Sequence, residues 1–491
     1  MNHTHTGYWY FFEIIYFKKI LLYILDDISN IGTMKIKIAA ISVVVALVLV
    51  AVVAYVATSD DEGGDYASTV YDYKEVGLTI LGNANGDYTI DQNDLDTIEG
   101  LVSEGKTGSS VLDKNGESHF LADADGNGSV DENDVSFVRE IIAGQAESIS
   151  ILDGHGNFAT VNTSPERVVC EFYSNAEILQ LMGAQQSIVA ADTALMLLDD
   201  YYLQGAIEGK VIDMGGHRSP DYEKVQELDP DLWLTYGDTI ADKSSKTTAT
   251  VVGLNLTDVN LEDIRKSGVV RGTLLAGYIF NNVEAAERYV DWVVDLWTQL
   301  DEVSSKLSDD DRPTVFYTGY GNYIVDDSKT VLRCFLEGTN IYQAVELAGG
   351  RNLIDDFNLS IEGSESNSID LEAVLDNEFD YVFVHSIKFT GGGTADANVP
   401  MHGYTTDDSS EWDSAHDYVA SLMPFRGLPE GNVVLSAGDF MNNASGGLLN
   451  AVLVATTINP GLYPDLDMQE IHQQYIDIMG FDFDLSQHGV F

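Results

Sequence analysis

The sequence predicts an α/β protein with two similar lobes joined by a long helix, preceded by a small all-α domain and an N-terminal transmembrane helix. Three observations support this fold class. From Ile149 onward, apolar strand patterns alternate with helical patterns, which is typical of parallel α/β sheets. One helix-strand phrase occurs twice, at Asp221 and at Asp370. Upstream of these, two acidic loops of equal spacing are each followed by a single helical pattern.

The N-terminus predicts a membrane anchor at residues 34–58. Lys35 and Lys37 precede about 20 apolar residues, the length that spans a bilayer, and an acidic linker at residues 59–71 follows. Because positive residues stay on the cytoplasmic side, we expect the rest of the chain to be extracytoplasmic, at the cell surface. Cleavage after a small residue near the end of the apolar run is the alternative. We interpret residues 1–33 as an over-extended reading frame, with a first transmembrane segment as the alternative.

The stretch DADGNGSVDEND, residues 123–134, has the residue order of a calcium loop. Calcium binds about six to eight oxygens, including the backbone carbonyl of position 7, and the loop needs a glycine at position 6, where Gly128 stands. A solvated acidic loop is the alternative, but such a loop has no reason to keep all these positions. The expected calcium ligands are Asp123, Asp125, Asn127, Ser129, Asp131 and Asp134.

The stretch NANGDYTIDQND, residues 83–94, repeats this order and predicts a second calcium site. Tyr88 occupies the position of the glycine, so the backbone must either accept a left-handed conformation at some cost or turn differently. This loop offers three carboxylates where the other offers four, so we expect the 123–134 loop to bind calcium more tightly. The expected ligands here are Asn83, Asn85, Asp87, Thr89, Asp91 and Asp94.

Each loop is followed by one helical pattern, and no good helix precedes either loop. This duplicated loop-helix unit, which we place at residues 72–147, resembles a dockerin, a calcium-binding module that pairs with cohesin domains. The resemblance implies calcium as a cofactor and a cohesin domain as a partner. It also implies that the residues at loop positions 10 and 11 take part in partner recognition; these are Gln92, Asn93, Glu132 and Asn133.

Composition narrows the classes of partner. The 491 residues include 25 Lys+Arg and 79 Asp+Glu, which gives a formal net charge of −54. Such a surface repels nucleic acid and anionic lipid headgroups, so we do not expect it to bind polyanions. The two cysteines, Cys170 and Cys334, are too few for a disulfide scaffold and lie in apolar stretches, which predicts two buried thiols. A disulfide or a reactive thiol is the alternative.

The remaining chain predicts two Rossmann-like lobes, at residues 148–281 and 309–491. A hairpin turned by Asp153 and Gly154 precedes a buried strand and a helix, and helix-strand units follow. The phrase from Asp221 aligns without gaps with the phrase from Asp370, and LQLMGAQQSIV resembles VELAGGRNLI. Between the lobes, residues 282–308 keep helical apolar spacing, which predicts one long linking helix.

These features occur in the order DGHGNFATVNTSPERVV, EILQLMGA, YEKVQELDPDLW, spanning helix, AVELAGGRNLI and LEAVLDNEFDYVFV. In this order they resemble the class III extracytoplasmic substrate-binding proteins. That family serves ABC importers of ferric siderophores, haem and cobalamin. The resemblance implies a metal chelate or corrinoid as the ligand and an ABC permease and ATPase as partners.

The resemblance also implies a ligand cleft at the ends of the parallel strands, where open sheets usually bind. Aromatic side chains there would cover a flat macrocycle, and Arg or His would meet its carboxylates or a metal. The alternative for each residue is ordinary packing. The expected cleft residues are Tyr173, His217, Arg218, Tyr236, Tyr320, Tyr323, His385, Trp412 and Arg426. Glu223 and Glu372 occupy equivalent places in the repeated phrase, and the family implies that they dock on the permease.

Two other classes of function compete with import. A dockerin-tethered hydrolase is one, but the sequence has no GxSxG, HExxH or GxGxxG motif of the kind that specific chemistry requires. An adhesion or scaffold protein that uses the dockerin, with a vestigial cleft, is the other. We expect a binding protein and not an enzyme.

Overall fold

The computed structural model of this chain describes residues 77–196, 210–258, 260–319, 331–337, 339–357, 366–386, 389–390, 394–395, 431–437 and 446–488. These residues belong to one compact unit, Asp72–Phe491. The expected leader, anchor and acidic linker at residues 1–71 lie outside them. Within the described ranges, no helix combines the length and the apolar character needed to cross a bilayer.

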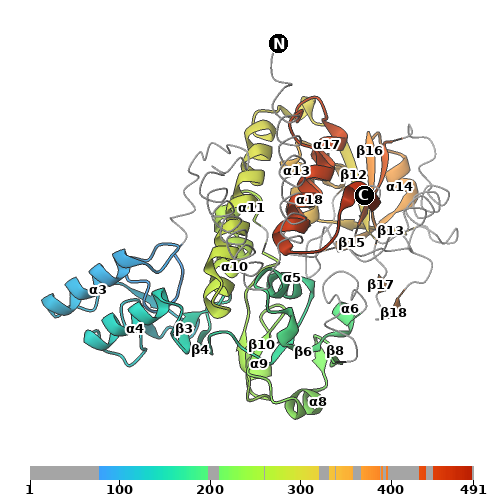
Figure 1. The fold of residues 1–491 in the computed structure, drawn as a ribbon. Helices are drawn as coiled ribbons and strands as arrows, with labels where there is room; N and C mark the ends of the chain where they lie inside the picture. Colours follow the sequence, from blue (N-terminus) through green and yellow to red (C-terminus); the bar gives the residue numbers. More distant parts are fainter. Residues whose placement is uncertain are drawn as a thin grey trace, which may run out of the picture. The chain divides into compact units, whose positions relative to one another are not determined.

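The small domain, residues 77–147, contains two helices that each begin at an acidic loop (Figure 1). Helix α3 (Gln92–Glu104) is capped by Asp91, and α4 (Glu132–Ile142) is capped by Asp131. In both helices the third residue is an aspartate that completes a capping box with the cap backbone. The aspartates at loop positions 9 and 12 therefore also cap the two predicted helices.

A β-hairpin lies between these helices, so the prediction of an all-α domain is wrong. It consists of β1 (Ser110–Leu112) and β2 (Ser118–Phe120), which pair antiparallel. The carboxylate of Asp113 accepts backbone N–H groups of Asn115 and Glu117 at 2.8 and 2.9 Å, and Gly116 has a φ of 84°. These contacts fix a tight turn that short strands need but that apolar periodicity does not reveal.

A second hairpin joins the small domain to the first lobe. Its strands are β3 (Ser148–Leu152) and β4 (Phe158–Asn162), with the turn at Asp153 as expected. Ile151 forms an antiparallel bridge with Ile80, and the N–H of Leu81 donates to the carbonyl of Ser150 at 2.8 Å. The small domain thus shares backbone pairing with the lobe that follows it.

The first lobe, called the N-lobe below, has a fully parallel sheet of order β11-β10-β5-β6-β7, which confirms the predicted topology. Its core is apolar and includes Val169, Trp233 and Val251. The strands are β5 (Val168–Cys170), β6 (Ile188–Ala191), β7 (Ile212–Asp213), β10 (Leu232–Leu234) and β11 (Thr250–Val252). Connecting elements are α5 (Tyr173–Leu181), η2 (Gln185–Ser187), α6 (Thr193–Met196), β8 (Gly215–Gly216), β9 (Ser219–Pro220), α8 (Tyr222–Glu227), α9 (Ile240–Ser244) and η3 (Ile264–Lys266).

The second lobe, the C-lobe, has a mostly parallel sheet, as expected, although one of its described strands runs antiparallel. The order is β15-β13-β12-β16-β19, with β14 also paired to β12. Strand β13 runs antiparallel to both β12 and β15, whereas β16 pairs parallel to β12 and β19. The strands are β12 (Thr314–Gly319), β13 (Val331–Phe335), β14 (Arg351–Asn352), β15 (Ser366–Asp370), β16 (Tyr381–Ser386) and β19 (Val433–Ala437), with β17 (Phe389–Thr390) and β18 (Thr394–Ala395) as a separate pair.

The predicted linking helix is α11 (Val283–Ser304). It packs beside α10 (Gly268–Ile279), and on the C-lobe side it contacts α13 (Asn340–Leu347) and α17 (Gly446–Ile458) (Figure 1). The indole N–H of Trp292 donates to Gln474 in α18 (Met468–Met479) at 3.2 Å. The other described elements of this part are η4 (Asp309–Asp311), η5 (Leu353–Asp356), α14 (Leu371–Leu375) and α19 (Leu485–His488).

The repeated phrase forms the same element pair twice. Asp221 caps α8, which leads into β10, and Asp370 caps α14, which leads into β16. Both cysteines are buried, Cys170 in β5 and Cys334 in β13, and no disulfide joins them.

Candidate functional site

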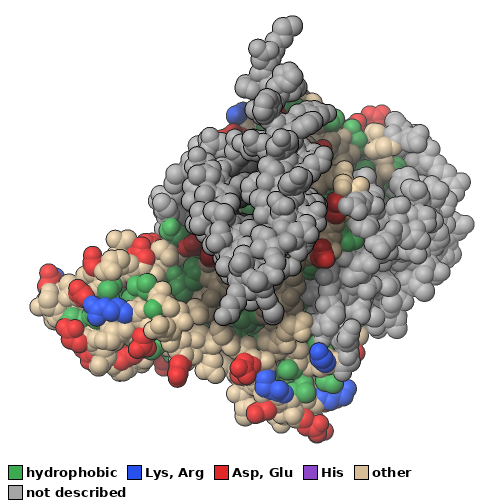
Figure 2. Space-filling model, in the orientation of Figure 1, with side chains coloured by type: hydrophobic (Ala, Val, Ile, Leu, Met, Phe, Trp, Pro, Cys, Tyr) green, Lys and Arg blue, Asp and Glu red, His purple; other side chains and the backbone are tan. Residues whose placement is uncertain are grey.

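The two acidic loops of the small domain have the same internal hydrogen bonds. Asp94 and Asp134, at position 12, are both 0% exposed. Each accepts the N–H of position 3 at 3.1 Å and the N–H of position 9, at 2.9 Å in the first loop and 2.8 Å in the second. Burial raises the pKa of both carboxyl groups, although these N–H donors lower it in part. Figure 2 shows further Asp and Glu side chains on the surface of this domain. Two buried carboxylates in a domain that is already acidic favour a bound cation.

The first residue of each loop supplies an oxygen that the protein does not satisfy. Asn83 is 0% exposed and Asp123 is 5% exposed. In both residues the Oδ1 atom is buried and accepts no hydrogen bond from the described part of the chain. In the second loop, carboxylate oxygens of Asp123, Asp125 and Asp134 lie within 4.8 Å of one another. This donor set, all oxygen and mostly charged, is the one that a hard divalent cation prefers.

The first loop turns without a left-handed residue at Tyr88. Positive φ angles occur at Gly86, at 73°, and at Gly126 and Gly128 of the second loop, at 71° and 88°, but not at Tyr88. Asn83 closes the first loop instead, because its amide Nδ2 donates to the carbonyl of Asp87 at 2.6 Å. The second loop closes through the N–H of Gly128, which donates to Asp123 at 2.8 Å.

The side chains at positions 10 and 11 remain accessible in the single chain. Gln92, Asn93, Glu132 and Asn133 are all exposed, in the first turns of α3 and α4. A partner can therefore reach all four of the residues expected to recognise it.

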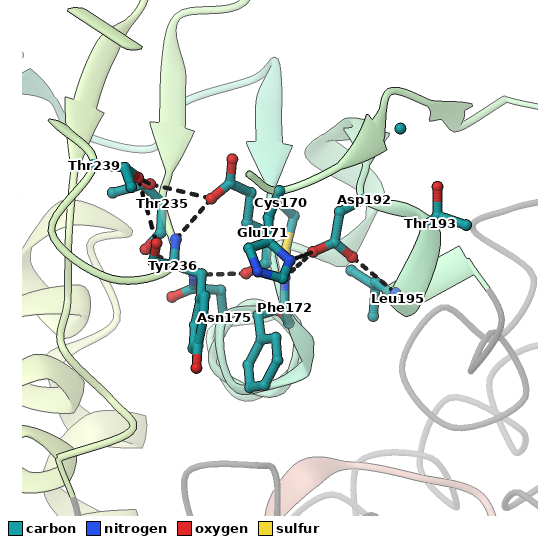
Figure 3. A network of polar contacts seen from close by, with 12 residues as sticks. Cys170, Glu171, Phe172, Asn175, Asp192, Thr193, Leu195, Thr235, Tyr236 and Thr239 are labelled. Atoms are coloured by element: carbon teal, nitrogen blue, oxygen red, sulfur yellow. Dashed lines mark hydrogen bonds and ion pairs between the residues drawn. The ribbon is translucent and has the colours of Figure 1, made fainter. Parts of the chain in front are cut away.

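A second cluster lies at the carboxyl ends of the N-lobe strands (Figure 3). Asp192 follows β6 and is 0% exposed, and its carboxylate accepts the N–H of Leu195 at 2.8 Å and that of Phe172 at 3.2 Å. The same carboxylate lies 3.4 Å from Nδ1 of His217, in the turn between β8 and β9. Nε2 of His217 is buried and has no hydrogen-bond partner among the described residues. A carboxylate on one ring nitrogen and a second nitrogen left open is the arrangement of a metal-binding histidine.

Aromatic rings surround this histidine. The rings of Phe172 and Tyr236 are stacked, with centroids 4.1 Å apart, and Tyr236 is 5.0 Å from His217 in an edge-on contact. Phe172 has a φ of 67°, a strained conformation for a residue with a side chain. The N–H of Phe172 donates to Asp192, so the carboxylate that orients the histidine also fixes the strained residue.

A buried ion pair between Lys243 and Glu171 lies next to this cluster. Lys243 and Glu171 are 1% and 0% exposed, and Nζ lies 2.8 Å from Oε2. Glu171 also accepts the backbone N–H of Tyr236 at 2.8 Å and the indole N–H of Trp233 at 2.9 Å. Burial raises the pKa of Glu171, and the charge of Lys243 acts in the opposite direction. The pair therefore sets the position of Tyr236 without facing solvent.

The structure places the other expected cleft residues differently. Tyr173 is only 6% exposed and packs against Phe172, so it offers little surface to a ligand. Arg218 is exposed beside His217. His385 belongs to β16 by its backbone. Tyr320, Tyr323, Trp412 and Arg426 lie outside the described residues. Glu223 and Glu372 are both exposed in the first turns of α8 and α14.

Sequence reasoning missed Phe172, Asp192, Glu171 and Lys243. A signal was present for Asp192, because a lone aspartate that directly follows the buried strand SIVAA stands at the edge where open sheets bind. For Lys243 there was no signal, because a lysine in the polar stretch ADKSSK reads as a solvated residue.

The two lobes resemble known proteins in sequence pattern and in fold. Residues 168–397 match the periplasmic binding protein family. A TroA-like periplasmic binding protein, FepB, from Veillonella parvula is 16% identical, with 68% of this chain and 97% of that chain covered and a TM-score of 0.52. A periplasmic solute binding protein from Veillonella parvula DSM 2008 is 14% identical, with coverage of 69% and 94% and a TM-score of 0.50. The lobes thus have the periplasmic binding protein fold. No curated protein matches the sequence.

Proposed function

We propose that this chain is an extracytoplasmic solute-binding protein that delivers a metal chelate or corrinoid to an ABC importer. Ferric siderophores, haem and cobalamin are the ligand classes, and the partners are an ABC permease and its ATPase. The family match and the fold support a solute-binding role outside the cytoplasm. Residues 34–58 would hold the protein at the cell surface. No reaction is assigned to the site, which binds and releases its solute.

The observation that carries this proposal is the pair Asp192–His217 at the strand ends. Since Asp192 engages Nδ1 at 3.4 Å, the buried Nε2 is the nitrogen left to meet a metal or another polar group of the solute. Tyr236 and Phe172 supply ring surface for a planar group next to it.

Calorimetric titration of the full chain with cobalamin, haem and a panel of ferric siderophores tests this proposal. We expect saturable binding of one ligand class, weakened by His217→Ala. His119→Gln is the matched control, because His119 lies in β2 of the small domain. Folded protein that binds none of these compounds would contradict the proposal and favour an adhesion or scaffold role.

We also propose that the small domain is a dockerin-like module that binds two calcium ions and attaches the chain to a protein partner such as a cohesin domain. Its support is the unsatisfied buried oxygen at position 1 of both loops, together with buried position-12 carboxylates. The first loop would use Asn83, Asn85, Asp87, Thr89, Asp91 and Asp94. The second would use Asp123, Asp125, Asn127, Ser129, Asp131 and Asp134.

Titration of the chelator-treated full chain with Ca²⁺ tests this second proposal. We expect two sites, the tighter one lost in Asp123→Ala combined with Asp134→Ala. The control is Asp96→Ala, because Asp96 is an exposed aspartate of α3 outside the loop. Binding that is unchanged by the double substitution would refute the assignment of the tighter site.

A further inference from the structure

The two calcium loops differ in their surroundings although their internal bonds agree. In the second loop, residues 125–129 are all exposed. In the first loop, residues 86–89 are half-buried and Ile90 is 5% exposed. Part of this burial comes from the N-lobe, where Tyr278 of α10 contacts the loop.

Tyr278 meets the first loop at the peptide group between positions 7 and 8. The N–H of Ile90 donates to the phenol oxygen of Tyr278 at 2.6 Å, and Thr89 Oγ1 lies 3.2 Å from the same oxygen. Tyr278 is 7% exposed. The contact is therefore a pair of hydrogen bonds in a largely dry interface.

One planar peptide group connects this contact to the expected cation. The carbonyl of Thr89 is the position-7 ligand of a calcium loop, and the N–H of Ile90 belongs to the same peptide. A cation on the carbonyl polarises the peptide and makes the N–H a stronger donor. It also fixes the orientation of the peptide, so the N–H already points at Tyr278 before the two surfaces meet.

The interface has a second contact. Asn281, just after α10, donates through Nδ2 to the carbonyl of Gly144 at 3.0 Å, at the end of α4. Tyr278 and Asn281 thus both hold the small domain at the C-terminal end of α10.

We propose that Ca²⁺ in the first loop stabilises the packing of the small domain on α10 of the N-lobe through Tyr278. The second loop has no hydrogen bond to Tyr278 among the described residues, so its occupancy is not expected to change this contact. This inference rests on the proposed calcium function, and it makes the small domain a calcium-dependent part of the binding protein in addition to an attachment module.

The test uses hydrogen exchange of the α10 amides in the full chain, with Ca²⁺ and with EGTA. Ca²⁺ should slow exchange by about two- to tenfold, the factor that corresponds to one net hydrogen bond. Asp94→Asn should abolish this difference, whereas the matched Asp134→Asn should retain it, since the two residues have the same role in different loops. Slowing that depends on Asp134 and not on Asp94 would overturn the proposal.

Linkage gives a reciprocal readout, because a coupling free energy acts equally in both directions. In the Asp134→Asn chain, the first loop is the remaining calcium site. There, Tyr278→Phe should weaken Ca²⁺ binding by the same two- to tenfold, which corresponds to the free energy of the lost contact. Tyr317→Phe is the control, because it removes a buried hydroxyl that bonds Asn450 in the C-lobe. If Ca²⁺ binds two sites but neither α10 exchange nor the Tyr278 variant responds, the coupling is refuted and the calcium sites stand. If the chain binds no Ca²⁺, both proposals fail.

Discussion

Replacement of Lys243 by methionine should strongly destabilise the N-lobe. The ammonium group of Lys243 lies 2.8 Å from Glu171 and 2.6 Å from Thr235, with both charged residues out of solvent. Methionine fills a similar volume but leaves the carboxylate of Glu171 buried without a cation. Breaking a buried pair in this way costs about 3 to 5 kcal/mol of unfolding free energy.

The loss of unfolding free energy in the Lys243→Met chain should depend on pH. Lys243 opposes the burial that raises the pKa of Glu171, so its removal raises that pKa further. A carboxyl group whose pKa is higher in the folded state than in the unfolded state binds its proton more tightly when folded. The Lys243→Met chain therefore regains stability as pH falls and loses it as pH rises through the raised pKa of Glu171.

Urea unfolding of the N-lobe at pH 5 and pH 7.5 measures both effects. Lys246→Met is the control, because Lys246 makes an exposed pair with Asp242 beyond the end of α9 and should change stability little. Glu171→Gln combined with Lys243→Met removes both charges and should restore most of the lost stability. A Lys243→Met chain as stable as the wild type at pH 7.5 would show that the pair is not buried as described.

Three further variants test the sites. Gly128→Ala should weaken Ca²⁺ binding at the second loop by about fivefold, because a Cβ atom at a φ of 88° costs about 1 kcal/mol. An unchanged affinity in calorimetry would refute the need for glycine at this position. Asp192→Asn should weaken binding of a metal-bearing solute by about 10- to 100-fold, because His217 loses the carboxylate charge beside Nδ1. An unchanged affinity in titrations at constant pH would contradict this. Glu223→Ala with Glu372→Ala should leave solute affinity unchanged and abolish stimulation of the permease ATPase in reconstituted vesicles; equal stimulation by both chains would exclude docking through these residues.

Local interactions explain what could be predicted from the sequence. The oxygen spacing of residues 83–94 and 123–134, the hairpin turn at Asp153 and the apolar stripe of α11 each depend on neighbours within a few residues, so their patterns can be read along the chain. The same holds for the helix-strand pairs α8-β10 and α14-β16, which begin at equivalent aspartates. The sequence alone thus determined the loop-helix units, the parallel N-lobe and the linking helix.

Long-range packing decided the rest. The burial of whole sheet faces decides which strands lie next to each other and in which direction they run. The residues of β13 predict a strand, but they do not predict that it pairs antiparallel within the C-lobe sheet. Asp192 reaches His217, and Lys243 reaches Glu171 across a separation of 72 residues, only once the parallel strands bring their carboxyl ends together. The contact of Ile90 with Tyr278 spans 188 residues. Such pairs leave no periodic trace, because side chains of ordinary type acquire their partners from the fold and not from their neighbours in sequence.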